Sequence, residues 1–272
     1  MKPTWSWQQQ SNCDYLTITS WQANGVEFLF TGRNGGKSCG DFSSLNLGLH
    51  VGDAYEDVIS NRRKVMFLLG QDLKVLVTAE QTHGAKVLLV NQEDRGKGAF
   101  QQSMALPETD ALITDQPEVY LALFFADCIP LGFFDPVTKA IGLAHGGWKG
   151  TRQGIAVKTI EAMQAAYGTQ PQDVEVVIGP GIGFCCFEIQ TELAAQIQAE
   201  LPTVAECIRQ DGPNWFWDLK ETNRKLLLQA GVLMENISDS KCCTACETDK
   251  FYSYRKENGH TGRMAAIIGI KE

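Results

Sequence analysis

Short apolar segments rich in β-forming residues alternate with a few longer amphipathic segments, and this alternation constrains the fold most. We predict strands over Val26–Phe30, Lys74–Ala79, Ala85–Val90, Ala111–Thr114, Tyr120–Phe125, Leu131–Phe134, Ile141–Ala144, Val174–Ile178 and Met264–Ile270. Apolar residues at helical spacing predict helices over Tyr55–Leu69, Arg152–Tyr167, Glu192–Glu200 and Glu221–Gln229. Many strands with few helices indicate an α+β (mixed α/β) fold in which helices cover large sheets.

The length of 272 residues is compatible with one continuous core. No internal repeat, low-complexity tract or linker divides the sequence. We therefore expect a single domain over residues 1–272, as a monomer or a homodimer.

The net charge of −8, with 32 acidic against 24 basic residues, argues against a nucleic-acid partner, whose phosphates need Lys and Arg. The strongly apolar run Tyr120–Ala126 is too short to cross a bilayer, so no membrane partner is expected. The N-terminal residues lack the pattern of a signal peptide, and nine cysteines are an odd number. We expect a cytoplasmic protein with reduced thiols.

Three residues of metal-ligand type lie at the ends of predicted strands: His83 in QTHG, Cys128 in ADC and His145 in AHGGWKG. Ligand sites gather at strand ends, because buried strands hold their termini rigidly. Two imidazoles and one thiolate suit zinc, and three protein ligands leave a position open for catalysis. These residues are far apart in sequence, so a small core cysteine and surface histidines are the plainer interpretation.

A second hypothesis makes Cys128 a nucleophile and His145 its general base, with N–H groups of the glycines after His145 stabilising an oxyanion. The spacing is equally compatible with this cysteine hydrolase or amidase. Asp127 precedes Cys128, so it could be a general acid/base, an orienting residue or a structural acid.

Positively charged groups near predicted turns could bind an anion. The GGWKGT turn leads into the helix predicted from Arg152, so its N–H groups could face a phosphate, although a plain tight connection would use the same glycines. Arg62, Arg255 and Arg263 lie at element ends, where a guanidinium can bind phosphate or a carboxylate.

The remaining cysteines give weaker signals. Cys243 and Cys246 form a C-x-x-C motif beside Cys242, but no second C-x-x-C pair completes a structural zinc site. Cys185 and Cys186 follow a glycine-rich loop. The glycines of that loop are interpreted as turn geometry, whereas Cys242, Cys243 and Cys246 are expected to form a buried, reduced cluster, with a redox role as the alternative.

QTHG, ADCIPLGFFDP, AHGGWKGT, IGPGIG, CTAC and FYSYR…TGRMA occur in the order found in the YfiH-like family, also called the multicopper polyphenol oxidase or laccase-domain family. The resemblance extends from about Gly32 to Ile270, and the chain resembles the family's bacterial purine nucleoside phosphorylases. It implies an α/β/β/α sandwich with mixed sheets, similar to that of putative cysteine hydrolases.

The resemblance also implies that His83, Cys128 and His145 bind zinc. It further implies purine nucleosides and phosphate as substrates: adenosine, inosine and S-methyl-5′-thioadenosine, with adenosine deaminase activity in addition. On this interpretation Asp127, Cys128 and His145 are catalytic, and Arg62, Arg255 and Arg263 bind substrate. Copper is expected at most for a secondary oxidase activity, because a multicopper enzyme needs many histidines and this chain has four.

Overall fold

The protein is described by a computed structural model that covers residues 3–271. Its first sheet contains six strands, of which β15 pairs antiparallel with both β3 and β7. In spatial order these are β1 (Trp5–Gln10), β2 (Cys13–Ile18), β3 (Val26–Thr31), β15 (Met264–Ile270), β7 (Tyr120–Phe125) and β4 (Leu76–Thr78). Strand β4 is parallel to β7, so the sheet is mixed.

The second sheet also has six strands and is also mixed, since β8 and β9 are antiparallel whereas β5 and β6 are parallel. In spatial order these are β14 (Ile237–Asp239), β10 (Glu175–Ile178), β8 (Ile129–Phe134), β9 (Ile141–Gly146), β6 (Ala111–Thr114) and β5 (Val87–Leu89). Strands β7, β8, β9 and β10 read as nearly continuous apolar runs because both faces of each sheet are covered.

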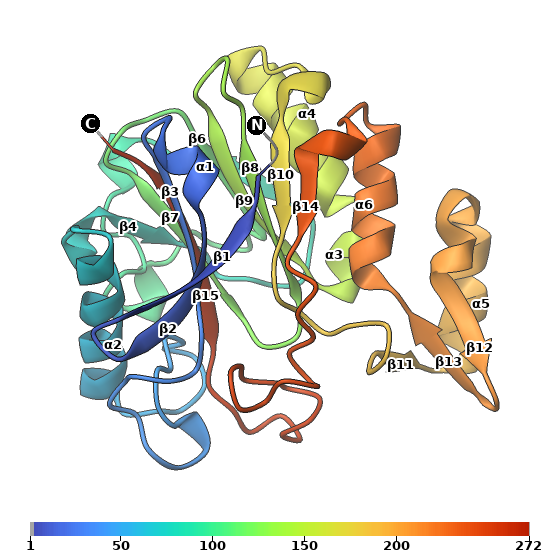
Figure 1. The fold of residues 1–272 in the computed structure, drawn as a ribbon, viewed down its shortest axis with the longest axis horizontal. Coiled ribbons are helices and arrows are strands. Elements are labelled where there is room, and N and C mark those ends of the chain that lie inside the picture. Colours follow the sequence, from blue (N-terminus) through green and yellow to red (C-terminus); the bar gives the residue numbers. More distant parts are fainter. Residues whose placement is uncertain (1–2, 272) are drawn as a thin grey trace.

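The two sheets pack face to face around an apolar layer (Figure 1). Phe28 and Phe125 of the first sheet lie in the same buried cluster as Phe134 and Leu143 of the second. Gly132 of β8 permits this close approach, because a Cβ there would lie 2.6 Å from the Phe28 ring. The facing sides of the two sheets therefore form the central apolar layer of the sandwich.

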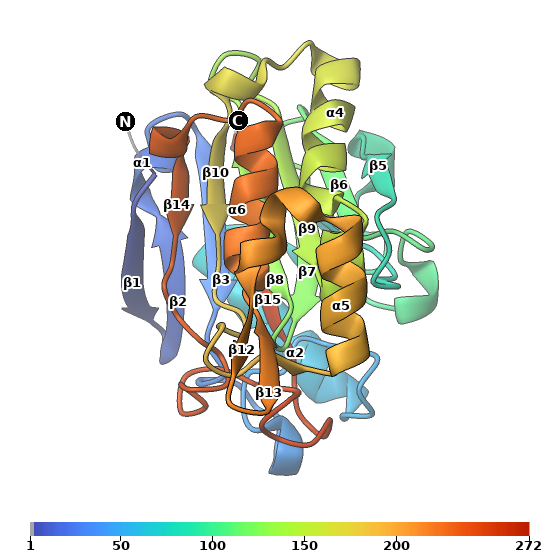
Figure 2. The same cartoon turned by 90° about the vertical axis from the view of Figure 1, so that its right-hand side faces the viewer.

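Helices cover the outer faces of the sandwich (Figures 1 and 2). Helix α2 (Tyr55–Leu68) buries Ile59, Val65 and Met66 against the first sheet. Helices α4 (Ile155–Tyr167) and α6 (Leu219–Gln229) pack on the second sheet. The resulting order of layers is helix, sheet, sheet, helix.

The other elements lie at the edges of this sandwich. A small antiparallel sheet of β11 (Glu188–Ile189), β13 (Asn214–Trp217) and β12 (Ile208–Asp211) lies beside α5 (Thr191–Glu200) at one end (Figure 2). The short helices are α1 (Thr19–Gln22) and α3 (Trp148–Arg152). Brief 3₁₀ helices lie in the connections, at Gly40–Phe42, Leu73–Val75, Gln92–Asp94, Gln102–Met104, Pro171–Asp173, Pro202–Cys207 and Met234–Asn236.

The structure confirms the predicted fold class and corrects one helix. The helix predicted over Arg152–Tyr167 is divided into α3 and α4, because Gly154 adopts a left-handed conformation with φ of 74°. Glycine adopts this conformation without the steric strain that a side chain would cause. Within residues 3–271, no helix is long and apolar enough to cross a bilayer.

Candidate metal centre

Three strand ends bring His83, Cys128 and His145 together. Cys128 lies in the connection by which the chain passes from β7 of the first sheet to β8 of the second, and His145 is near the end of β9. His83 lies in the turn after β4 with φ of 61°. One ligand atom from each of these residues lies within 4.8 Å of the others. We call this group the His–Cys–His centre.

Asp110 holds two of these ligands in place. Its Oδ1 atom lies 2.8 Å from Nδ1 of His145 and also accepts a hydrogen bond of 2.9 Å from the amide of His83. Its Oδ2 atom accepts hydrogen bonds from the amides of Thr82 and Gly84. A carboxylate behind a metal-binding histidine fixes the ring and leaves the other nitrogen for the metal. Asp110 was not among the residues predicted from the sequence.

The centre has the electrostatics of a thiolate–imidazole site. Burial alone raises the pKa of the Cys128 thiol, but the charges and hydrogen bonds of His145 and His83 outweigh it and lower that pKa to about 6. Burial lowers the pKa of His145, but Cys128 and Asp110 outweigh this and raise it to about 9. Cys128 is therefore poised to be an anionic ligand or nucleophile.

The glycine turn after His145 packs against the centre. A Cβ on Gly147 would lie 3.0 Å from the His83 ring and 3.2 Å from Sγ of Cys128. Helix α3, which begins at Trp148, has five residues. Close packing against these side chains therefore explains the glycines of the turn. Of the two alternatives, a tight connection and an anion site, the structure favours the tight connection.

The His–Cys–His centre lies in the wall of a cavity of about 820 Å³. Asp127, Arg255 and Arg263 also line this cavity, so the structure brings them together with the three ligands. Apolar and aromatic residues complete much of the wall, including Phe124, Trp148, Phe187 and Tyr254. A large, partly apolar cavity with a few polar groups is typical of a small-molecule site.

Arg62 is placed elsewhere, with 2% of its surface exposed. Its guanidinium donates hydrogen bonds to the carbonyls of Leu47, Gly98 and Ala99. It packs on the ring of Phe124, whose own side chain lines the cavity. Arg62 therefore supports the loops around the cavity and is not among the residues that line it.

Asp127 connects the cavity wall to Arg255. Its carboxylate accepts hydrogen bonds from the hydroxyls of Thr244 and Ser253 and from the amide of Arg255. Asp127 itself adopts a left-handed conformation with φ of 83°. With its oxygens occupied in this way, Asp127 is better suited to positioning the loops than to transferring a proton.

Arg255 and Arg263 each use one terminal nitrogen to bond the main chain. Nη1 of Arg255 donates to the carbonyls of Cys186 and Glu188, and Nη1 of Arg263 donates to those of Thr261 and Gly262. Such anchoring pre-orients a guanidinium and reduces the entropy lost on binding an anion.

His50 also lines the cavity and was not selected from the sequence. Burial, followed by the positive charges of Arg263 and Arg62, lowers the pKa of His50 to about 4. The neutral ring of His50 can donate or accept a hydrogen bond. Its position in LGLH, before a glycine turn, carried no signal that distinguishes it from a surface histidine.

The residues of the His–Cys–His centre fit zinc. Two imidazoles and one thiolate are zinc donors, the separations are compatible with one shared ion, and Asp110 supplies the outer hydrogen bond that metal-binding histidines use. All three residues line the cavity, so an ion held by them would lie at the cavity wall.

Known proteins share this fold and much of this sequence. The purine nucleoside phosphorylase YlmD of Bacillus subtilis is 42% identical over 245 residues, which cover 89% of this chain and 88% of that protein. The mouse protein named purine nucleoside phosphorylase LACC1 is 34% identical, over 89% of this chain and 55% of its own length.

Solved structures agree with the sequence comparison. The YlmD structure from Geobacillus stearothermophilus superposes with a TM-score of 0.91 at 40% identity and covers 98% of this chain and 99% of that one. The hypothetical protein YfiH of Bacillus licheniformis gives a TM-score of 0.92 at 40% identity, with 97% and 99% covered. Residues 27–271 match the family described as multi-copper polyphenol oxidoreductase laccase, and the chain belongs to that family.

Proposed function

We propose that the chain is a zinc-dependent purine nucleoside phosphorylase that acts on adenosine, inosine and S-methyl-5′-thioadenosine, with adenosine deaminase activity in addition. One observation carries the proposal: the His–Cys–His centre shares a single cavity with two anchored arginines. The names of the relatives from Bacillus subtilis and mouse point to the same reaction class. The cavity of about 820 Å³ has room for a nucleoside and a phosphate.

In this reaction a phosphate oxygen bonds to C1′ of the ribose while the bond from C1′ to the purine nitrogen breaks. We assign Arg255 and Arg263 to the phosphate, because each guanidinium is already held by main-chain carbonyls. The aromatic residues Phe124 and Trp148 would stack on the purine. A donor such as His50 could hydrogen-bond the leaving purine, on which negative charge develops.

His83, Cys128 and His145 would hold the zinc, with Asp110 fixing the tautomer of His145. When bound, zinc would supply a Lewis acid beside the cavity, which would suit stabilisation of charge on a purine and also the hydrolytic removal of its amino group.

A cysteine hydrolase is the second proposal, because one specific arrangement favours it. Cys128 has a lowered pKa, its neighbour His145 is hydrogen-bonded to Asp110, and the three form a nucleophile, base and orienting acid. Copper-dependent polyphenol oxidation is a weaker alternative, since the centre offers two histidines and the whole chain has four.

The test is a product analysis of zinc-loaded protein with inosine and inorganic phosphate. The proposal predicts hypoxanthine and ribose 1-phosphate in equal amounts, and no hypoxanthine when phosphate is omitted. Hypoxanthine formed at the same rate without phosphate would indicate hydrolysis instead. Full activity after a chelator has removed the zinc would show that the reaction does not need the metal.

A further inference from the structure

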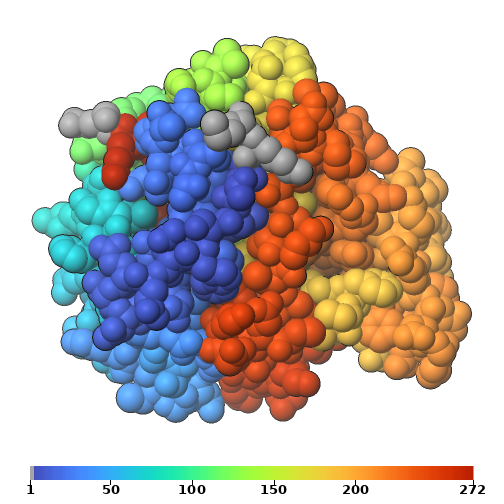
Figure 3. Space-filling model, in the orientation of Figure 1, coloured from blue at the N-terminus to red at the C-terminus, as the bar shows by residue number. Residues whose placement is uncertain are grey.

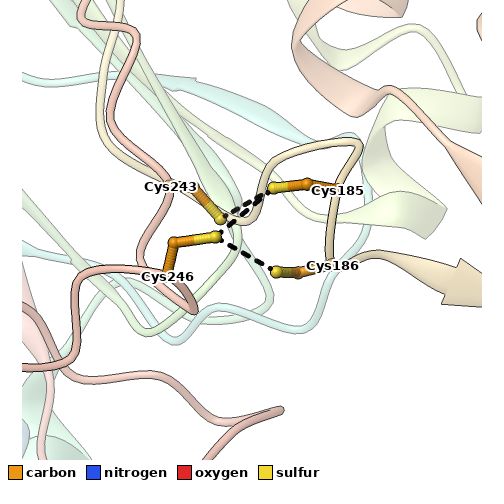
Figure 4. A group of neighbouring side chains, drawn as sticks. All are labelled: Cys185, Cys186, Cys243 and Cys246. Carbon is orange, nitrogen blue, oxygen red and sulfur yellow. Dashed lines mark hydrogen bonds between the residues drawn. The ribbon is translucent and has the colours of Figure 1, made fainter.

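Four cysteines outside the cavity converge on one point at the surface of the protein. Cys185 and Cys186 belong to the loop between β10 and β11, and Cys243 and Cys246 to the loop after β14. Figure 4 shows the four side chains pointing toward one another from these two loops. All four sulfurs lie within 4.8 Å of one another. We call this group the tetracysteine cluster.

The spacing of the sulfurs matches four ligands of one metal ion. The sulfur of Cys185 lies 3.6 Å from that of Cys243 and 3.5 Å from that of Cys246, and the sulfurs of Cys186 and Cys246 are 3.4 Å apart. Zinc–sulfur bonds of about 2.3 Å in a tetrahedron place neighbouring sulfurs about 3.8 Å apart. A disulfide brings its sulfurs to about 2.05 Å, and all four cysteines here are free thiols.

The surrounding backbone also suits a thiolate cluster. The amide of Gly183 donates a hydrogen bond of 3.1 Å to Sγ of Cys243. A Cβ on Gly183 would lie 3.2 Å from Sγ of Cys185 and 3.3 Å from Sγ of Cys243, so glycine lets the main chain approach both sulfurs. Amide hydrogen bonds to ligand sulfurs are the outer contacts that orient thiolates in metal sites.

We propose that the tetracysteine cluster binds one structural zinc ion, separate from the His–Cys–His centre. Four protein thiolates complete the tetrahedron and leave no open position, which is the arrangement of a structural site. Cys185 and Cys246 are exposed, so an ion can enter from solvent.

The ion would fasten together two segments that form one side of the cavity. Figure 3 shows the yellow segment near residue 180 against the orange-red C-terminal part of the chain. The two loops are joined by a short β-bridge between Gly181 and Cys243. The first loop continues into Phe187, which lines the cavity, and its Cys186 carbonyl accepts a hydrogen bond from Arg255. Zinc at the cluster therefore stabilises a wall of the cavity without contacting substrate.

The sequence alone does not reveal this site, because the chain contains no second C-x-x-C pair. The partner of the Cys243–Cys246 motif is the adjacent pair Cys185–Cys186, which is not a usual zinc spacing and lies far away in sequence. The expectation of a buried cluster around Cys243 and Cys246 is also corrected, since Cys246 is exposed.

The experiment measures zinc and iron per chain by mass spectrometry in three proteins purified under reducing conditions: the wild type, Cys243→Ser/Cys246→Ser and Cys242→Ser. Cys242 is the matched control, because it neighbours the motif but its sulfur donates to the carbonyl of Ser240. The proposal predicts that the double variant contains one zinc fewer than the wild type and that the control loses none. Equal zinc in all three proteins, or iron in place of zinc, would overturn it.

A second measurement leaves all four cysteines of the cluster in place, so it does not depend on how the Cys243→Ser/Cys246→Ser variant folds. Cobalt(II) added to metal-free protein should give the intense sulfur-to-cobalt absorption of four thiolates, and this absorption should persist in Cys128→Ser. Cys128→Ser should lose the zinc of the His–Cys–His centre and keep the ion of the tetracysteine cluster. The two zinc proposals can therefore fail independently of each other. A disulfide between the two cysteine pairs in freshly purified, unreduced protein would contradict a metal site.

Discussion

Asp110 and His145 are joined by a hydrogen bond of 2.8 Å between Oδ1 and Nδ1, and both side chains are buried. This contact orients the imidazole so that Nε2 is the nitrogen left for a metal ion. The same carboxylate holds the turn that carries His83. One acidic residue therefore determines the positions of two of the three ligands.

Replacing Asp110 with Asn should weaken zinc binding at the His–Cys–His centre by about 10- to 100-fold, the usual effect of losing an outer hydrogen-bond partner. Competition against a fluorescent chelator measures the affinity. Asp211→Asn, in an exposed strand of the small sheet, is the control and should bind zinc like the wild type. Equal affinity in both variants would show that Asp110 does not orient the ligands.

His83→Ala separates the metal hypothesis from the cysteine hydrolase. His83 is a ligand in the first but is not required by the Cys128–His145 pair of the second. We expect the variant to lose zinc and to lose phosphorolysis by more than about 100-fold, since losing a ligand costs more than losing an outer partner. His260→Ala, an exposed histidine that does not line the cavity, is the control. Full turnover by His83→Ala would favour the nucleophile.

Arg263→Lys tests the assignment of the phosphate. Lysine keeps the positive charge but loses the planar fork that binds two oxygens at once. The KM for phosphate should rise by about 10-fold while the KM for inosine changes little, as initial-rate kinetics would show. Arg95→Lys, on the exposed surface, should match the wild type. An unchanged KM for phosphate in Arg263→Lys would place the anion elsewhere in the cavity.

Gly132→Ala tests the contact between the two sheets. The new methyl group would lie 2.6 Å from the Phe28 ring and 2.8 Å from Val177, so the sheets must separate or distort. We expect the free energy of unfolding to fall by about 1–3 kcal/mol in denaturant titrations. Gly142→Ala, with contacts no closer than 3.3 Å, should lose less. A larger loss of stability in Gly142→Ala than in Gly132→Ala would mean that the interface between the sheets is not tightly packed.

Much of the fold was predictable because its central strands are continuous apolar runs. Tyr120–Phe125 and Met264–Ile270 were predicted with the bounds that the structure gives them. One strand that escaped prediction has a different character. Strand β1 (Trp5–Gln10) is polar and largely exposed at the edge of its sheet, so burial imposes no alternation of apolar and polar residues on it.

The candidate site was predictable only in part. The three ligands follow recognisable strands, but their meeting depends on how the sheets pair. The antiparallel register of β6 and β9 sets Ala111 opposite Ala144, which brings Asp110 beside His145. That pairing is a long-range contact with no local signal at Asp110. Arg62 shows the reverse error. Its charge suggested a substrate-binding residue, whereas its side chain is buried and supports the loops around the cavity.

Zinc at the His–Cys–His centre is tested most directly by anomalous X-ray diffraction from crystals of the active protein, with data collected on both sides of the zinc absorption edge. We expect an anomalous peak that appears only above the edge and lies between the side chains of His83, Cys128 and His145. Active crystals with no zinc signal at this position would contradict it.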